Sequence, residues 1–424
     1  MKPAATSAMT PDCASWLAAL ATKARISPSN RWQRPDRLPP HHPLGLPEQV
    51  LLVSSSARWL AQSARRAGIG AVTLDHYADA DTAAAATLAV ALPDTGQGFD
   101  PDLLLDTCQR IAPPATCPLI YGSGLDSQPA LLRRLARQRE VIGNPPALQR
   151  IFRNPRRFFA VLDACAIPYP EVRFTPPENP TDWLIKSGCS EGGKRVRFCA
   201  HDSLSAGDYW QRRVEGPARS VLFLANGRQS RTIGFNTLWT LGMGQQPFLF
   251  AGALNRTDLD PAAQRQLERH VAELVQYTGL KGLNSLDFMV DDRGTPRVIE
   301  VNTRPSATMA LYDADARDGL LAAHIEACRH GRLEVDLKPS PVRASRVWLA
   351  PALIAVAPDT PWPAWTADRP PAGSVVSPQH PFCSVLAEGQ SVAEVTACIE
   401  HRNAALQHQF NRDRRDRSPT RLSH

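Results

Sequence analysis

The sequence lacks the patterns that mark several large classes of protein. Nine cysteines are scattered singly along 424 residues, with no CxxC pair, which argues against a zinc site or a disulfide framework and fits a cytoplasmic protein. No apolar run approaches the roughly 18 residues of a membrane span, and the first residues show no signal-peptide core or cleavage site. No Gly-x-Gly-x-x-Gly turn follows the first expected strand, so a dinucleotide-binding fold is not supported.

The formal net charge of +7 is the one feature that points toward nucleic acid as a partner. Part of this excess lies in residues 411–424, where five arginines stand against two aspartates. No zinc-finger spacing and no RRM-type aromatic signature accompanies it. Anionic substrates and phosphates explain a mild positive balance equally well. We therefore expect neither a nucleic-acid partner nor a membrane partner.

Residues 284–308 carry the strongest chemical signal in the chain. Apolar side chains alternate on both sides of a polar Asp-Asp-Arg-Gly turn, a pattern that predicts two strands joined as a hairpin. In the first strand Leu286 and Phe288 would face the core, and in the second Ile299 and Val301 would do so. The two-residue period of a strand then assigns the polar residues to the other face.

That polar face is expected to hold a cation, because three oxygen-bearing side chains converge there: Asp287, Glu300 and Asn302. Two carboxylates about 4 to 5 Å apart repel by roughly 3 to 4 kcal/mol at an effective dielectric near 20, so a semi-buried pair needs a proton or a cation. Oxygen ligands suit Mg²⁺ or Mn²⁺ better than zinc. Arg304 adds a guanidinium group suited to phosphate or carboxylate. From this stretch alone, an ordinary solvated hairpin face remains an alternative.

The spacing D-(x)12-E-x-N-x-R of this hairpin resembles the ATP-grasp superfamily, and the resemblance extends from about Val50 to Arg329. It implies an α/β chain with a parallel-sheet N-terminal domain, an α+β ATP-binding domain with a small lid, and a C-terminal lobe. In that family the matching Asp, Glu and Asn bind two magnesium ions that bridge the phosphates of ATP. The resemblance therefore implies ATP and Mg²⁺ (or Mn²⁺) as cofactors.

Composition and resemblance together divide the chain into five parts. We expect a proline-rich arm at 1–47, an N-terminal α/β domain at 48–144, the ATP-grasp domain at 145–334 with its lid at about 182–212, a C-terminal lobe at 335–410 and a basic disordered tail at 411–424.

Two loops of the N-terminal domain are candidates for ligand binding. Residues 54–56 follow the first expected strand and either cap a helix or offer backbone N–H groups to an anion. Residues 122–124 follow a later strand, where ligands collect in open parallel sheets, although a simple turn explains them equally well. In the family the second substrate binds partly to this domain.

The lid is expected around Lys186, which an apolar strand delivers to a glycine-rich loop. Gly192 and Gly193 give that loop the freedom to wrap phosphates with backbone N–H groups. A glycine-rich turn alone is more often only a hairpin. The resemblance assigns Lys186 to phosphate binding and the loop to closure over ATP.

After the lid, the resemblance places adenine recognition at Arg213 and Val214, with Glu215 beside them. Many members carry a glutamate two residues after the following glycine to hold ribose. This chain has Ala218 there, so ribose recognition must differ or depend on Glu215.

Three further positions concern the phosphates of ATP. The family usually carries a lysine where this chain has Pro155, and Arg156 or Arg157 is the candidate substitute. Arg231, on an expected strand, is the candidate to face the γ-phosphate or an acyl phosphate, with an exposed strand arginine as the alternative. Together with Arg304 it forms the expected catalytic pair.

The resemblance implies an ATP-dependent ligase that phosphorylates a small carboxylate and joins it to an amine. Within the superfamily the chain looks most like predicted carboligases related to biotin carboxylase, which often accompany methanopterin- and methanofuran-type one-carbon pathways. A homodimer is among the assemblies that this resemblance allows. Three alternatives stay open: a carboxylase that uses bicarbonate, a small-molecule kinase of the same fold, and a non-catalytic ATP-binding module.

Overall fold

The computed structural model describes residues 45–188, 191–199, 204–205 and 207–416. Nearly all of the arm expected at 1–47 and the end of the tail lie outside these residues. The first part of the tail is helical, because α10 (Val392–Asp416) continues through it. The prediction of disorder from 411 onward was therefore wrong for 411–416, a stretch that contains no glycine or proline to end the helix.

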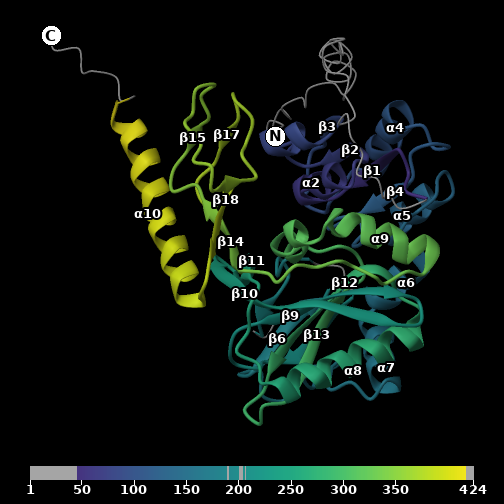
Figure 1. The fold of residues 1–424 in the computed structure, drawn as a ribbon. Coiled ribbons are helices and arrows are strands. Elements are labelled where there is room, and N and C mark those ends of the chain that lie inside the picture. The colour runs from purple at the N-terminus through teal and green to yellow at the C-terminus, as the bar shows by residue number, and fades with distance from the viewer. Residues whose placement is uncertain (1–44, 189–190, 200–203, 206, 417–424) are drawn as a thin grey trace, which may run out of the picture. The chain divides into compact units, whose positions relative to one another are not determined.

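The N-terminal domain is built on a parallel sheet with the strand order β3-β2-β1-β4 (Figure 1). Its strands are β1 (Gln49–Val53), β2 (Gly70–Asp75), β3 (Leu88–Ala91) and β4 (Leu119–Tyr121). Its helices are α2 (Arg58–Arg66), α3 (Ala80–Ala85), α4 (Pro101–Ile111) and α5 (Pro129–Ala136). The strand order reverses between β1 and β4, so the loops that leave these two strands flank a topological switch point.

Both faces of this parallel sheet are buried at β1, β2 and β4, whereas the edge strand β3 is half-buried. Leu51 and Val53 of β1 pack into one apolar cluster with residues of α4 and α5. Val50 and Leu52 pack into a second cluster with α2 and with α9 (Gly319–His330). This continuous burial explains why the strands read as unbroken apolar runs in the sequence.

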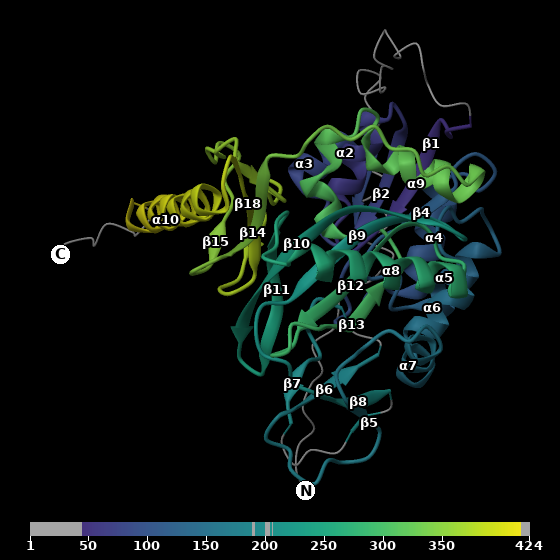
Figure 2. The ribbon, with the colours of Figure 1, turned by 60° about the horizontal axis from the view of Figure 1, so that its bottom comes forward.

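Two helices, α6 (Pro146–Phe152) and α7 (Pro155–Ala164), lead from this domain to a small antiparallel sheet, the lid (Figure 2). Asn154 caps α7 by accepting a hydrogen bond from the backbone N–H of Arg157. The lid strands are ordered β5-β8-β6-β7 and comprise β5 (Val172–Arg173), β6 (Trp183–Ser187), β7 (Arg197–Phe198) and β8 (Asp208–Arg212). Trp183, Ile185 and Trp210 form its core.

The central sheet is antiparallel and has eight strands in the order β13-β12-β9-β10-β11-β14-β18-β16. They are β9 (Arg219–Asn226), β10 (Ser230–Met243), β11 (Gln246–Leu254), β12 (Lys281–Val290), β13 (Pro296–Asn302), β14 (Val342–Leu349), β16 (Thr366–Ala367) and β18 (Pro381–Gly389). The C-terminal lobe is thus continuous with this sheet, because β14 pairs with β11. The lobe adds a separate pair of short strands, β15 (Ile354–Ala355) and β17 (Val375–Val376), and its own core around Trp348, Phe382 and Phe410.

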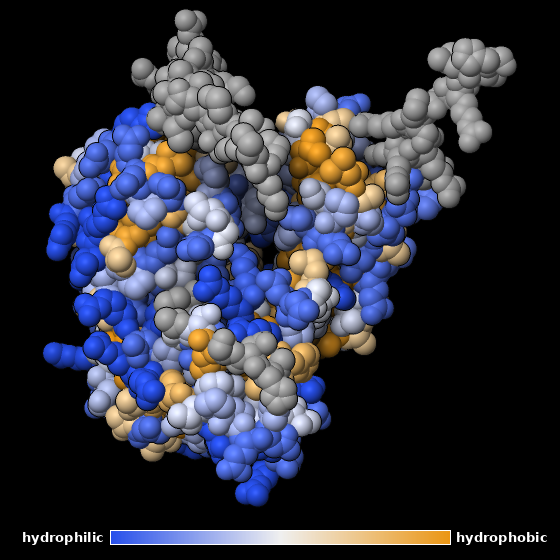
Figure 3. Space-filling view, turned by 180° about the vertical axis from the view of Figure 1, so that it is seen from behind, coloured by the Kyte–Doolittle hydropathy of each residue, from blue (hydrophilic) through white to orange (hydrophobic). Residues whose placement is uncertain are grey.

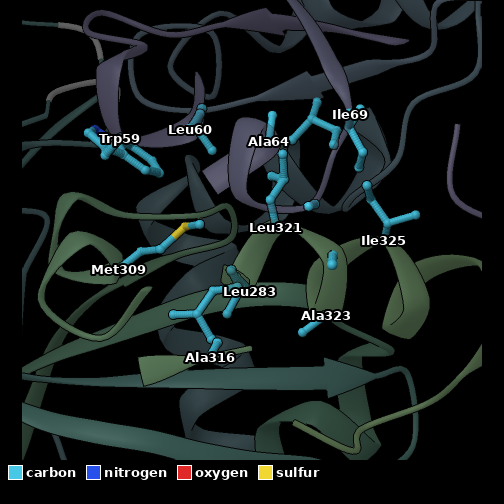
Figure 4. Close-up of a cluster of buried hydrophobic side chains, with 14 of the residues drawn as sticks. Trp59, Leu60, Ala64, Ile69, Leu283, Met309, Ala316, Leu321, Ala323 and Ile325 are labelled. Carbon is cyan, nitrogen blue, oxygen red and sulfur yellow. The ribbon is translucent and has the colours of Figure 1, made fainter. Parts of the chain in front are cut away.

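The two faces of the central sheet differ, and this difference positions the site. One face is apolar at β9, β12 and β13 and packs against α7 and α8 (Pro261–Thr278). The other face is apolar only at one end, where Leu283 of β12 lies beside Leu321 and Ile325 of α9 (Figure 4). At its opposite end this second face carries polar side chains, among them Ser220 and Asn236, both buried.

On the molecular surface, hydrophobic residues form separate patches on a mostly hydrophilic face (Figure 3). No helix in the described part of the chain is both long enough and apolar enough to cross a membrane.

Candidate active site

The hairpin β12–β13 brings the three expected oxygen donors to one face. Asp287 lies opposite Glu300, and Ser285 lies opposite Asn302. The amide nitrogen of Asn302 donates a hydrogen bond to Oδ2 of Asp287 at 3.1 Å. The structure therefore places Asp287, Glu300 and Asn302 together, on the polar end of the central sheet.

The register of the second strand differs from the expected one. The pairing shifts between Asp287 and Phe288, so Ile299 is the extra residue of a β-bulge. Val298 and Val301 are buried in the apolar cluster, whereas Ile299 is only half-buried. The prediction that Ile299 shares the buried face with Val301 was therefore wrong, because a bulge interrupts the strict alternation.

The electrostatics of this face favour a bound cation. Burial, together with the nearby charge of Glu300, raises the pKa of Asp287 to about 7. The charges of Arg304 and Lys186 only partly oppose this rise. A divalent cation between the two carboxylates would relieve the same repulsion.

The donor set fits Mg²⁺ shared with a nucleotide better than a site made of protein alone. Among the described residues, no group of three or more His, Cys, Asp or Glu side chains could hold a metal ion. The side-chain oxygen of Asn302 already accepts a hydrogen bond from Nη2 of Arg304 at 3.2 Å. Mg²⁺ is commonly held by one or two carboxylates plus substrate phosphates and water, which is the arrangement that Asp287 and Glu300 offer.

Lys186 reaches this face from the lid strand β6. Its ammonium nitrogen donates to the carbonyl oxygen of Ile299 and to Oε1 of Gln211, each at 3.3 Å. Burial lowers the pKa of Lys186, and the charges of Glu300 and Asp287 counteract that effect. Lys186 therefore lies at the same face as the two carboxylates, and its binding of ATP phosphate stays a prediction.

Two residues that the sequence did not indicate, Asp126 and Arg153, complete the charged cluster. The carboxylate of Asp126 is fully buried and accepts hydrogen bonds from Nη2 of Arg153 and, at 3.2 Å, from Nε of Arg304. Arg153 also lies 3.3 Å from Oε1 of Glu300 through its Nη1. Burial raises the pKa of Asp126, but the charges of Arg153 and Arg304 outweigh it and hold that pKa below its usual value.

Arg153 supplies a cation close to the position where the family carries a lysine. It stands two residues before Pro155, just ahead of the Asn-Pro start of α7. Arg156, the expected substitute, instead stacks its guanidinium group 4.1 Å above the ring of Phe174. A basic residue directly before the Asn-Pro cap was the only available sequence signal for Arg153, whereas Asp126 had none.

The glycine-rich loop packs against the central sheet. The backbone N–H of Phe250 donates to the carbonyl oxygen of Gly192 at 3.0 Å. A Cβ atom at Gly193, where φ is +77°, would lie 1.9 Å from the carbonyl oxygen of Phe248. Only glycine fits this close approach.

Arg213, Val214 and Glu215 lie in the segment that joins β8 of the lid to β9 of the central sheet. The backbone N–H of Arg213 donates to the carbonyl oxygen of Asp182 at 2.7 Å, which fixes this junction to the lid. Its side chain lies 3.7 Å from that of Glu215, and both side chains are exposed. This segment is the connection between the lid and the central sheet, and adenine binding by it stays a prediction.

Arg231 lies away from the carboxylates, contrary to the expectation. It pairs with Leu224, which pairs with Leu283, four residues before Asp287 on β12. Four residues of strand span about 13 Å. Arg231 instead donates to the carbonyl oxygen of Leu333 at 3.4 Å and lines a hollow of about 500 Å³.

Comparison with known proteins agrees with this arrangement. Residues 154–308 match the ATP-grasp domain family. Residues 154–308 form an ATP-grasp domain. This matched region runs from the cap of α7 through the lid and the β12–β13 hairpin to residue 308, so it contains Lys186 and all three oxygen donors.

Several solved structures share the fold of this chain. The biotin carboxylase domain of 2-oxoglutarate carboxylase from Hydrogenobacter thermophilus, crystallised with MgADP and bicarbonate, has a TM-score of 0.64 at 13% identity over 81% of this chain and 86% of that one. Biotin carboxylase from Campylobacter jejuni has a TM-score of 0.63 at 11% identity over 82% of this chain and 89% of that one. N5-carboxyaminoimidazole ribonucleotide synthetase from Thermotoga maritima has a TM-score of 0.61 at 13% identity over 84% of this chain and 98% of that one. Among curated proteins, none matches the sequence.

Proposed function

We propose that the protein is an ATP- and Mg²⁺-dependent ligase that transfers the γ-phosphoryl group of ATP to the carboxylate of a small molecule, releases ADP, and then joins the acyl group to an amine, which displaces inorganic phosphate. The observation that supports this most strongly is the meeting of Lys186 from the lid with Asp287 and Glu300 from the hairpin. The carboxylates that would bind a metal ion and the ammonium group that would bind phosphate oxygens therefore share one semi-buried face. This pairing is what phosphoryl transfer requires.

The side chains of the site have distinct tasks in this proposal. Asp287 and Glu300, with the oxygen of Asn302, would hold Mg²⁺, which when bound neutralises charge on the transferring phosphoryl group. Lys186 and Arg304 would bind phosphoryl oxygens. The lid would exclude water from the activated carboxylate, which would otherwise be hydrolysed.

The partners in this proposal are ATP, a small carboxylate and an amine. Carboxylate and amine pairs from one-carbon cofactor synthesis are the first to test, as the sequence resemblance suggests. Lys186 and the buried guanidinium groups of Arg153 and Arg304 would suit the anionic reactants. Size-exclusion chromatography would test whether the protein forms a homodimer.

A second candidate is a carboxylase that activates bicarbonate in place of an organic carboxylate. It is favoured by the neighbours of this fold, one of which was crystallised with bicarbonate. The two candidates differ in one observable: a carboxylase would release ADP when bicarbonate is the only carboxylate added, whereas the ligase would also need an organic carboxylate.

The experiment that tests the proposal is a screen of carboxylate and amine pairs, with a bicarbonate arm, for release of phosphate from ATP. Asp287→Ala and Glu300→Ala are expected to abolish release, and Asp292→Ala, in the exposed turn of the same hairpin, is the matched control. Turnover in Asp287→Ala and Glu300→Ala equal to that of the wild type would refute the proposed site. A phosphorylated alcohol as final product would instead show a kinase.

A further inference from the structure

A carboxylate of the protein itself lies between the loop that follows β1 and the loop that follows β4 in the N-terminal domain. We call the place between Ser55 of the first loop and Gly124 of the second the niche. Glu191, in the glycine-rich loop of the lid, accepts a hydrogen bond at Oε1 from the hydroxyl of Ser55 at 3.0 Å. Its Oε2 accepts a hydrogen bond from the backbone N–H of Gly124 at 2.5 Å. Both carboxylate oxygens are therefore bound, one by each loop.

The niche is held together by contacts that do not involve Glu191. The backbone N–H of Ser55 donates to the carbonyl oxygen of Ser123 at 2.7 Å, and the hydroxyls of Ser54 and Ser123 lie 3.3 Å apart. Gly124 has φ of +88°, and a Cβ atom there would lie 2.5 Å from Oγ of Ser55. The two donors are thus pre-positioned, and only glycine permits their close approach.

The loop that carries Gly124 is joined to the proposed phosphoryl-transfer site by ion pairs. Asp126, two residues after Gly124, accepts a hydrogen bond from Nη2 of Arg153. Nη1 of the same guanidinium group lies 3.3 Å from Oε1 of Glu300. The niche and the cation site are therefore connected through Asp126 and Arg153.

We propose that the niche of Ser55 and Gly124 binds the carboxylate of the small-molecule substrate, and that Glu191 fills it as an internal competitor when substrate is absent. This inference rests on the proposed ligase function and names the position of its acceptor. The lid glutamate reproduces the charge and the two oxygens of the ligand. Substrate binding then displaces Glu191.

The test uses acetate as the minimal carboxylate probe, titrated into the full-length protein without ATP and followed by NMR saturation transfer. A carboxylate tethered by a short loop competes at an effective concentration in the millimolar range. Glu191→Ala should therefore bind acetate about tenfold more tightly than the wild type. Glu178→Ala, an exposed glutamate of the same lid, should bind acetate as the wild type does.

Adding Ser55→Ala to Glu191→Ala should remove this gain in affinity for acetate, because one of the two donors is lost. Equal acetate affinity in Glu191→Ala and the wild type would overturn the inference and would leave Glu191 as a latch of the lid only. No effect of Ser55→Ala in the Glu191→Ala background would overturn it as well.

The outcome is separable from that of the ligase proposal because acetate binding is read without turnover. If carboxylates stimulate phosphate release but Glu191→Ala gains no affinity for acetate, the niche is refuted and the ligase stands. If Glu191→Ala gains affinity as expected but no carboxylate stimulates phosphate release, the ligase is refuted.

Discussion

Replacing Asp126 by asparagine is the perturbation for which the structure gives the clearest magnitude. The carboxylate of Asp126 is fully buried between two guanidinium groups whose side chains are 6% and 8% exposed, those of Arg153 and Arg304. Its lowered pKa means that it is ionised at neutral pH. Asparagine keeps the shape but removes the carboxylate that the two buried guanidinium groups share, and Glu300 remains beside that of Arg153.

Removing one member of a buried ion pair costs about 3 to 5 kcal/mol, because the remaining charge stays out of water. We expect Asp126→Asn to lower the free energy of unfolding by that amount in urea denaturation followed by circular dichroism. Combining it with Arg153→Gln should recover part of the loss, since the double variant removes one of the two positive charges that the carboxylate of Asp126 had balanced. A coupling of about 1 kcal/mol or more between the two changes is expected.

A matched control exists on the surface of the same domain. Asp102 forms an ion pair with Arg134 at 2.8 Å, but both side chains are well exposed. Asp102→Asn should cost less than about 1 kcal/mol, as is typical of surface ion pairs. A loss in Asp126→Asn no larger than that in Asp102→Asn would refute the role given to the buried cluster.

Two further predictions concern stability and the lid. Burial lowers the pKa of His324 from 6.5 to about 4. The stabilisation of the fold that is present above pH 6.5 is therefore lost as the pH falls toward 4. The free energy of unfolding should decrease by about 2 kcal/mol between pH 7.5 and 5. His324→Gln should reduce this pH dependence in urea denaturation, and an unchanged dependence would contradict the assignment. Gly193→Ala should weaken MgATP binding by about tenfold or more in calorimetry, because the carbonyl oxygen of Phe248 leaves no room for a Cβ atom there. Gly192→Ala is the control: a Cβ atom there faces open space, so the affinity for MgATP should change about twofold at most. Equal effects of the two substitutions would contradict the packing argument.

The sequence predicted the parts of the site that depend on local periodicity. Strand alternation identified Asp287, Glu300 and Asn302 as members of one face, and the strand before the glycine-rich loop identified Lys186. These inferences succeed because side-chain direction in a strand follows directly from residue order. The bulge at Ile299 leaves no mark in composition, so its effect on the register was missed.

The parts that the sequence did not predict depend on contacts between distant segments. Asp126 and Arg304 are 178 residues apart, and only the packing of the N-terminal domain against the hairpin brings them together. Arg231 was misplaced because its distance from Asp287 is set by the registers of β9, β10 and β12, which a single sequence does not reveal. Glu191 was overlooked for the same reason, since Ser55 lies 136 residues away.

The central claim is that Asp287 and Glu300 bind a cation together with ATP, and titration calorimetry of ATP with and without Mg²⁺ tests it most directly. The wild type should bind ATP tightly only with Mg²⁺, and Glu300→Gln should lose about tenfold or more of that affinity, equivalent to about 1.4 kcal/mol. Asp292→Asn, on the exposed turn, should behave as the wild type. Equal ATP affinity with and without Mg²⁺, or an unchanged affinity in Glu300→Gln, would contradict the account.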